Sequence, residues 1–212
     1  MNKTTLKKEP VIRENIEWCK IWVPDSVEPE LKIPRVLLVG DSISVGYGPR
    51  VSSLLAEKGS VAWVGTSRFP ADPVFLEEIL LVLRHTRFDL IHFNNGLHGF
   101  DNSDESYAES LPKILTELRE ASAGAKWILA NSTPMRKPDH LEEWHPFTER
   151  IRFRNDVVRQ LAAGQGLLLT DLFETVETHP EFYSPDGTHF NDEGQFALAG
   201  RVVATLEKTG IL

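Results

Sequence analysis

The feature that most constrains the fold is an alternation of short apolar runs with longer amphipathic runs, which begins at Arg35. The short runs are rich in Val, Leu, Ile and aromatic residues, and they predict strands at 35–40, 61–65, 88–94, 126–131 and 167–171. Helices are predicted at 49–58, 73–86, 104–122, 147–163 and 192–208. This order indicates an α/β protein with a flavodoxin-like three-layer sandwich, in which helices cover both faces of a five-stranded parallel sheet.

The chain before Arg35 has a different character. Residues 1–14 contain Lys, Thr and Glu with few large apolar side chains, so we predict that they are disordered. Residues 15–23 are dense in apolar side chains and predict an extended arm that packs on the domain. We therefore expect residues 1–34 to form a disordered N-terminus and a packed arm, and residues 35–212 to form the folded domain.

The composition excludes several classes of partner. The net charge of -8 argues against nucleic acid or an anionic membrane, because both bind clustered Lys and Arg. The sequence has no apolar run of 18 or more residues that would predict a membrane span, and no apolar segment follows the basic N-terminus, so we expect a cytoplasmic protein. The single cysteine, Cys19, excludes an intramolecular disulfide. The oligomeric state is left open.

Polar side chains follow the predicted strands, at the edge where ligands bind in an open α/β sheet. Asp41-Ser42 follows the first strand, and Asp186-Gly187-Thr188-His189 lies between the last strand and the last helix. A serine hydroxyl is a poor nucleophile until a base removes its proton, and that base must be held in the right tautomer. Because only two residues separate Asp186 from His189, both side chains can face one pocket with Ser42.

These residues resemble the SGNH hydrolases, also called GDSL-like esterases. Gly40-Asp41-Ser42-Ile43 matches the first block of that family, Gly65 lies where its second block has a glycine, and Asp186 with His189 matches its last block, Asp-x-x-His. The resemblance covers about residues 35–208. It implies the same three-layer fold.

The resemblance also implies a serine-dependent mechanism. Ser42 would be the nucleophile, His189 the base and Asp186 the residue that orients the base. The backbone amides of Ser42 and Gly65 would bind the oxyanion. No metal and no cofactor are implied.

The third block departs from the family pattern. The family has Gly-x-Asn-Asp there, in which the asparagine donates to the oxyanion, whereas this chain has Gly96, then His98 and Gly99. A histidine can donate one N–H, so we predict that His98 fills this role. Asn94 and Asn95, slightly earlier in the chain, are the alternative donors.

Three further residues are candidates for the substrate site. Asp41 lies beside the nucleophile and is also expected to anchor its turn. Arg136 and Trp144 lie in the long stretch 132–146, which is longer than a simple turn. Arg136 could meet an anionic group of the substrate, and Trp144 could contact its alcohol part. Two His and two Glu also lie in this stretch, but without helical spacing, so no metal site is predicted.

The function predicted from these residues is a serine esterase that acts on small acyl esters, with O-acetyl groups on a carbohydrate as one such substrate. The partner would be a small-molecule or carbohydrate ester. Two other functions remain open. The replacement of Asn and Asp by His98 and Gly99 suggests a catalytically impaired binding module of the same fold. An acyltransferase would share the same triad and the same acyl-enzyme.

Overall fold

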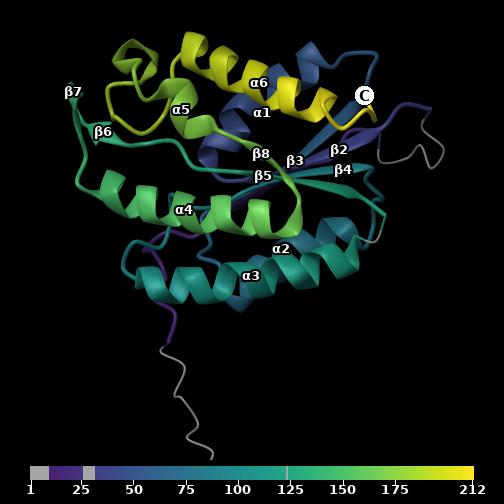
Figure 1. Ribbon diagram of the computed structural model, residues 1–212, viewed down its shortest axis with the longest axis horizontal. Helices are drawn as coiled ribbons and strands as arrows, with labels where there is room; N and C mark the ends of the chain where they lie inside the picture. Colours follow the sequence, from purple (N-terminus) through teal and green to yellow (C-terminus); the bar gives the residue numbers. More distant parts are fainter. Residues whose placement is uncertain (1–9, 26–31, 123) are drawn as a thin grey trace, which may run out of the picture.

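The computed structural model describes residues 10–25, 32–122 and 124–212. Its centre is a six-stranded sheet with the strand order β1-β3-β2-β4-β5-β8. Helices lie on both faces of this sheet (Figure 1). The strands are β1 (Cys19–Trp22), β2 (Arg35–Gly40), β3 (Ser60–Thr66), β4 (Leu90–Asn94), β5 (Lys126–Ala130) and β8 (Leu168–Thr170).

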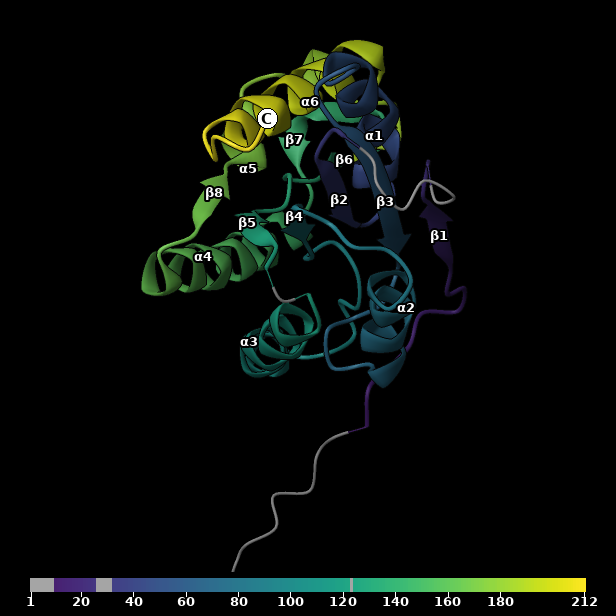
Figure 2. The ribbon, with the colours of Figure 1, turned by 90° about the vertical axis from the view of Figure 1, so that its right-hand side faces the viewer.

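The helices form the two outer layers of the sandwich. In Figure 2, α1, α5 and α6 lie on one side of the sheet and α2, α3 and α4 on the other. Their bounds are α1 (Ser42–Leu54), α2 (Pro73–Leu83), α3 (Asp104–Ala121), α4 (Phe147–Gln165), α5 (Leu172–Val176) and α6 (Asp192–Glu207). A short 3-10 turn, η1 (Pro180–Phe182), precedes α6.

The central strand β2 shows why these residues form a buried sheet. Its residues 36–39 are completely buried, as expected for a parallel strand covered on both faces. Val36 and Leu38 pack into the core beneath α1 and α6, whereas Leu37 and Val39 pack into the core beneath α2 and α3. Successive side chains of one strand therefore serve the two cores in alternation.

The predicted fold class is confirmed, with one addition to the sheet. The five predicted strands correspond to β2, β3, β4, β5 and β8, which are parallel to one another. The sixth strand, β1, comes from the predicted arm and pairs antiparallel with the edge of β3. All four residues of β1 are exposed, so the strand lacks the alternation of buried and exposed side chains by which a strand is recognised in a sequence.

The N-terminal prediction was correct only in part. The structure places residues 10–14 against the domain, where Ile12 N–H donates to Asn102 Oδ1 at 2.8 Å, so these residues are not disordered. The contacts are made by single polar side chains to residues distant in sequence, which local composition does not reveal. The rest of that prediction, residues 1–9, lies outside the described residues.

Two further elements differ from expectation. Helix α1 begins at Ser42, seven residues before the predicted start at 49, because the Asp41 side chain caps it and tertiary packing overrides the weak helix preference of its glycines and Pro49. The stretch 132–146 contains a hairpin of β6 (Arg136–Lys137) and β7 (His140–Trp144) rather than an open loop. Within the described residues, no helix has the length and apolar character needed to cross a membrane.

Candidate active site

The candidate nucleophile lies at a sharp turn from strand to helix. Strand β2 ends at Gly40, and α1 begins at Ser42. Asp41 Oδ1 accepts the N–H of Ile43 at 2.9 Å and so caps the helix. A Cβ on Gly40 would lie 1.9 Å from Ser44 Oγ, so this turn requires glycine. As the first helical residue, Ser42 has a backbone N–H without an intrahelical acceptor, at the positive end of the helix dipole.

The structure brings Ser42, His189 and Asp186 together in one hydrogen-bonded chain. His189 Nε2 lies 2.9 Å from Ser42 Oγ, and His189 Nδ1 lies 2.7 Å from Asp186 Oδ2. With Nδ1 protonated towards the carboxylate, Nε2 is free to accept the hydroxyl proton. The side chains of His189 and Asp186 are 49% and 52% exposed, so this chain opens directly to solvent.

The ionisation of Asp186 suits this arrangement. Its burial opposes the charged form, but hydrogen bonds from the backbone N–H groups of His189 and Thr188 and from the His189 ring outweigh it and lower the pKa of Asp186. The two backbone bonds to Oδ1 measure 2.8 and 2.9 Å. A carboxylate held in its charged form can stabilise an imidazolium beside it.

The hairpin β6–β7 supports the loop that carries Asp186 and His189. Arg136 N–H donates to Gly187 O at 2.7 Å, and Asp139 N–H donates to Pro185 O at 3.0 Å. Gly187 has a φ of +70°, and a Cβ there would lie 2.2 Å from Arg136 O. The glycine in Asp-x-x-His is therefore the point at which the hairpin backbone approaches the loop.

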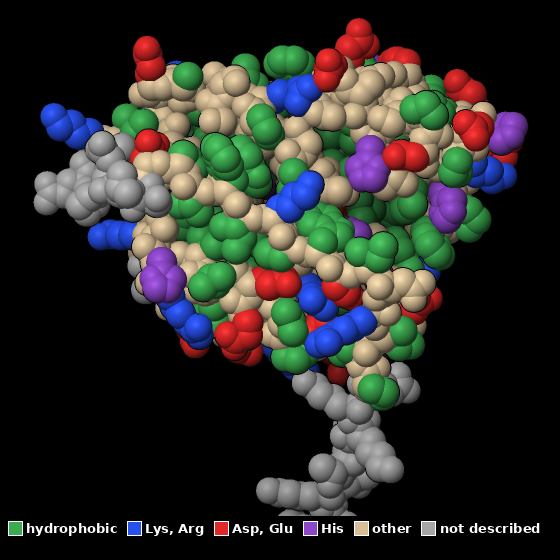
Figure 3. Space-filling model, turned by 180° about the vertical axis from the view of Figure 1, so that it is seen from behind, with side chains coloured by type: hydrophobic (Ala, Val, Ile, Leu, Met, Phe, Trp, Pro, Cys, Tyr) green, Lys and Arg blue, Asp and Glu red, His purple; other side chains and the backbone are tan. Residues whose placement is uncertain are grey.

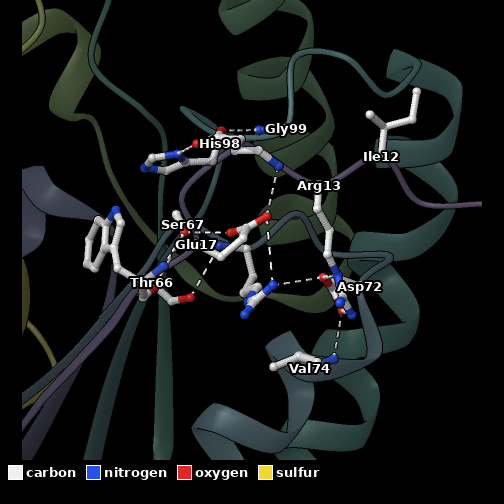
Figure 4. Close-up of polar contacts among 12 residues, drawn as sticks. Ile12, Arg13, Glu17, Thr66, Ser67, Asp72, Val74, His98 and Gly99 are labelled. Atoms are coloured by element: carbon white, nitrogen blue, oxygen red, sulfur yellow. Dashed lines mark hydrogen bonds and ion pairs between the residues drawn. The ribbon is translucent and has the colours of Figure 1, made fainter.

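His98, on the loop after β4, pairs with the N-terminal arm, which in the structure comprises residues 10–23 (Figure 4). Its Nδ1 lies 3.0 Å from Glu14 Oε1, and the same oxygen accepts the N–H of Gly99 at 3.0 Å. Burial raises the pKa of Asp41, while His98 and His189 both act electrostatically against that rise. Both imidazoles thus lie near enough to the turn that carries Ser42 to act on Asp41.

Buried Arg154 of α4 holds the loop that follows β4. Its guanidinium donates to the carbonyl oxygens of Gly96 at 2.9 Å and His98 at 2.8 Å. It also lies over the ring of Phe100, 4.5 Å from the ring centroid. This loop is therefore held by two groups: Arg154 binds its carbonyl oxygens, and Glu14 binds the His98 ring and the Gly99 N–H.

The alternative oxyanion donors, Asn94 and Asn95, are engaged in the fold. Asn94 Nδ2 donates to the carbonyl oxygens of Ala130 at 3.1 Å and Asn131 at 2.9 Å, which ties the end of β4 to the end of β5. Asn95 Nδ2 donates to Arg68 O at 3.1 Å. Of the three predicted donors, His98 keeps a ring nitrogen, Nε2, without a hydrogen-bond partner among the described residues.

Gly65 lies inside β3 rather than after it, between Gly40 of β2 and Lys20 of β1. A Cβ at this position would lie 2.3 Å from Val45 Cγ2 and 3.2 Å from Asp41 O. The structural reason for glycine is thus the close approach of the first turn of α1. Its predicted role as an oxyanion donor stays a prediction.

The prediction that Arg136 meets an anionic group of the substrate does not agree with the position of its side chain. Its side chain is buried, donates to Leu141 O at 2.7 Å and to Glu177 O at 2.5 Å, and lies between the rings of Trp144 and Tyr183. Its guanidinium therefore joins the hairpin to the segment before η1 and is not available to an anionic substrate group. The hairpin and its buried pocket for Arg136 were not apparent from the sequence.

The other two candidates for substrate contact differ in exposure. Asp41 is 3% exposed and serves as the cap of α1, so it anchors the turn, as expected, and does not face a substrate. Trp144 on β7 is 36% exposed, with the Arg136 guanidinium 4.1 Å from its ring centroid. The contact of Trp144 with substrate stays a prediction. Among the described residues, no group of three or more His, Cys, Asp or Glu could hold a metal ion.

Fold and site together define a class: three-layer α/β proteins with a serine, histidine and aspartate hydrogen-bonded at the carboxyl edge of the sheet. Residues 38–196 match the model of the GDSL-like lipase/acylhydrolase family, and the chain belongs to that family. The family resemblance inferred from the sequence is thereby confirmed. A sequence search of curated proteins gave no match.

Solved structures of similar fold include three from organisms of different kinds. A GDSL-like lipase from Bacteroides thetaiotaomicron is 17% identical, with a TM-score of 0.65 over 83% of this chain and 89% of that one. A carbohydrate esterase family 3 protein from Talaromyces cellulolyticus is 17% identical, with a TM-score of 0.67 over 84% and 98%. A carbohydrate acetylesterase from Sinorhizobium meliloti is 13% identical, with a TM-score of 0.65 over 83% and 99%. At these identities the likeness establishes the shared fold.

Proposed function

We propose that the protein is a serine esterase that hydrolyses small acyl esters, with O-acetyl groups on carbohydrate as the first substrates to test. The observation that carries this proposal is the hydrogen-bonded chain from Ser42 Oγ through His189 to Asp186, at 2.9 and 2.7 Å. A chain of this geometry is what activates a hydroxyl for attack on an ester carbonyl.

The reaction has two halves. Ser42 Oγ attacks the carbonyl carbon while its proton passes to His189 Nε2, and Asp186 stabilises the imidazolium that forms. The bond to the alcohol oxygen then breaks, and His189 gives its proton to that oxygen. Water attacks the acyl-enzyme with His189 as base, and the acid leaves as Ser42 recovers its proton.

The oxyanion of each tetrahedral intermediate needs hydrogen-bond donors that point at the former carbonyl oxygen. The N–H of Ser42 at the start of α1 supplies one, and the positive end of the helix adds to it. His98, whose Nδ1 faces Glu14, supplies the second through Nε2 when its ring carries both protons. This arrangement replaces the asparagine of the family pattern with an imidazole.

Two observations support the choice of hydrolysis and of a small, uncharged substrate. The half-exposed His189 and Asp186 leave water free access to the acyl-enzyme, as hydrolysis requires. On the face in Figure 3, Lys and Arg side chains are interspersed with Asp and Glu and do not gather into a basic patch. Acetylated carbohydrate is proposed because two proteins of similar fold are named as carbohydrate esterases.

The proposal is tested by turnover of p-nitrophenyl acetate, butyrate and octanoate, followed by release of acetate from acetylated xylo-oligosaccharides. The wild-type protein and Ser42→Ala are measured side by side. We expect turnover that depends on Ser42 and is fastest with acetate. Equal turnover in the two proteins would contradict the mechanism. Tight binding of an acetylated sugar without any turnover would favour the binding-module alternative.

A further inference from the structure

The N-terminal arm forms a second histidine–carboxylate pair, whose imidazole acts electrostatically on Asp41, the residue before the nucleophile. Glu14 comes from the arm and His98 from the loop after β4, and they meet at 3.0 Å across 84 residues of sequence. The two side chains are 34% and 19% exposed, so the pair is shielded more than His189 and Asp186 are. The Glu14 carboxylate bridges the His98 ring and the Gly99 amide.

The position of Glu14 is fixed by contacts on both sides of it. Before it, Ile12 and Asn102 exchange two hydrogen bonds of 2.8 Å. Next to it, Arg13 forms a two-point ion pair with the buried Asp72, at 2.6 and 3.0 Å. After it, Glu17 accepts the Glu14 N–H at 3.0 Å and the Ser67 hydroxyl at 2.6 Å. The arm is therefore held by its other residues, and the Glu14 carboxylate is not needed as its attachment.

The contact with Glu14 sets which protons His98 can carry. A carboxylate accepts hydrogen bonds only, so Nδ1 must hold a proton. Nε2 is then the nitrogen left for the site, and it accepts a hydrogen bond when the ring is neutral and donates one when the ring carries both protons. The other charged groups around His98 are the buried Asp41, which acts on it electrostatically, and Arg154, which donates to its carbonyl oxygen and not to its ring.

We propose that Glu14 is a positioning residue of the active site: it accepts the hydrogen bond of the Nδ1 proton of His98 and fixes the ring with Nε2 free, so that the doubly protonated ring donates to the oxyanion through Nε2. The arm thus completes the site with a group that the domain at 35–212 lacks. This inference rests on the proposed esterase function. It assigns to Glu14, towards His98, the part that Asp186 has towards His189.

A four-protein cycle tests this inference: wild type, Glu14→Gln, His98→Asn and the double variant. Loss of an oxyanion donor costs about 10²–10³-fold in kcat, so loss of the residue that orients the donor should cost less, about 10-fold, with KM nearly unchanged. His98→Asn replaces the imidazole by the amide of the family pattern and serves as the background in which no ring is left for Glu14 to orient. In that background Glu14→Gln should have no further effect, because an asparagine needs no counter-charge.

Glu17→Gln is the matched control, because it removes the same charge from the same arm without touching His98. We expect it to leave kcat within about twofold, since the glutamine oxygen still accepts the Glu14 N–H and its NH2 group can donate to Ser67 Oγ. An equal loss of kcat from Glu14→Gln in the wild-type and His98→Asn backgrounds would overturn the inference, because it would show a purely structural role. So would an unchanged kcat in Glu14→Gln.

A second measurement does not depend on turnover and separates this inference from the proposed function. In protein labelled with 15N-histidine, NMR should show a protonated Nδ1 on His98 that is lost or exchanges faster in Glu14→Gln. An unprotonated Nδ1 in the wild type would overturn the inference even if the esterase is active. If no ester is turned over but the Nδ1 proton depends on Glu14, the proposed function fails, while the pairing is upheld.

Discussion

The two histidine–carboxylate pairs of the molecule carry similar chemistry from very different origins. In one pair, His189 and Asp186 are three residues apart in one loop, and the histidine contacts Ser42 Oγ at 2.9 Å. In the other pair, His98 meets Glu14 across 84 residues, and its second ring nitrogen has no partner among the described residues. In the proposed mechanism this difference has a reason: the base contacts the nucleophile before substrate binds, whereas an oxyanion donor meets its partner only when substrate reacts.

The largest expected effect distinguishes the two histidines directly. His189→Ala removes the base and should lower kcat by about 10⁴–10⁶-fold, whereas His98→Ala removes one oxyanion donor and should cost about 10²–10³-fold. Steady-state kinetics on p-nitrophenyl acetate measures both. Equal losses in the two variants would break the proposed division of roles, and a larger loss in His98→Ala would reverse it.

The partner of the base should matter next. Asp186→Asn keeps an oxygen for the backbone N–H groups of Thr188 and His189 but loses the charge that stabilises the imidazolium. We expect kcat to fall by about 10²–10⁴-fold with KM nearly constant. Because Glu14→Gln is expected to cost only about 10-fold, the pair of variants compares the two carboxylates directly. An Asp186→Asn enzyme as active as Glu14→Gln would contradict the assignment of Asp186 to the triad.

The support beneath the Asp186–His189 loop can be tested with two glycines. Gly187 and Gly166 both have positive φ, +70° and +63°, but only Gly187 has a neighbouring backbone, Arg136 O, where a Cβ would lie. Alanine at either position strains the backbone by about 1–3 kcal/mol. Gly187→Ala should lose more stability than Gly166→Ala in urea unfolding, and it alone should lower kcat. Equal behaviour would mean that the hairpin does not position the loop.

The sequence was sufficient to predict the part of the candidate site whose residues lie close together in the chain or directly follow a strand. Parallel strands with continuous apolar runs end within two residues of the observed bounds, and Asp186 with His189 forms a motif within four residues. Ser42 was identified because it directly follows a predicted strand, at the edge of the sheet where ligands bind. His98 was predicted from its spacing to Gly96, and the structure places it near enough to the turn that carries Ser42 to act on Asp41.

The other part could not be predicted, because its contacts depend on single residues far apart. Glu14 lies in a stretch of low hydrophobicity, and nothing near it in sequence indicates that its carboxylate meets His98. Arg136 looked available for a substrate because its burial depends on the hairpin folding over it. Both cases are polar groups whose partners are set by tertiary structure, for which periodicity carries no signal.

The smallest expected effect concerns the pH dependence of stability, in which two aspartates of the site should act oppositely. The pKa of Asp186 is lowered in the folded state, so its contribution to stability is present above the ordinary value of about 3.9 and is lost as pH falls through the folded pKa. Burial raises the pKa of Asp41, so its contribution is full below about pH 4 and is lost as pH rises towards the folded pKa.

Urea unfolding between pH 3 and pH 7 checks these signs. Relative to the wild type, Asp186→Asn should lose stability as pH rises through this range, and Asp41→Asn should gain it, since asparagine still accepts the Ile43 N–H. If the stability of both variants relative to the wild type changed in the same direction with pH, the pKa values of Asp186 and Asp41 would not be shifted in opposite directions.

The central claim is that Ser42 is the activated nucleophile, and covalent labelling tests it most directly. The protein is incubated with a fluorophosphonate, and intact mass and peptide mapping locate the adduct. The account predicts one phosphonyl group per chain, on Ser42, which is absent in Ser42→Ala and slow to form in His189→Ala. An adduct on another residue, or equal labelling of Ser42→Ala, would contradict the account.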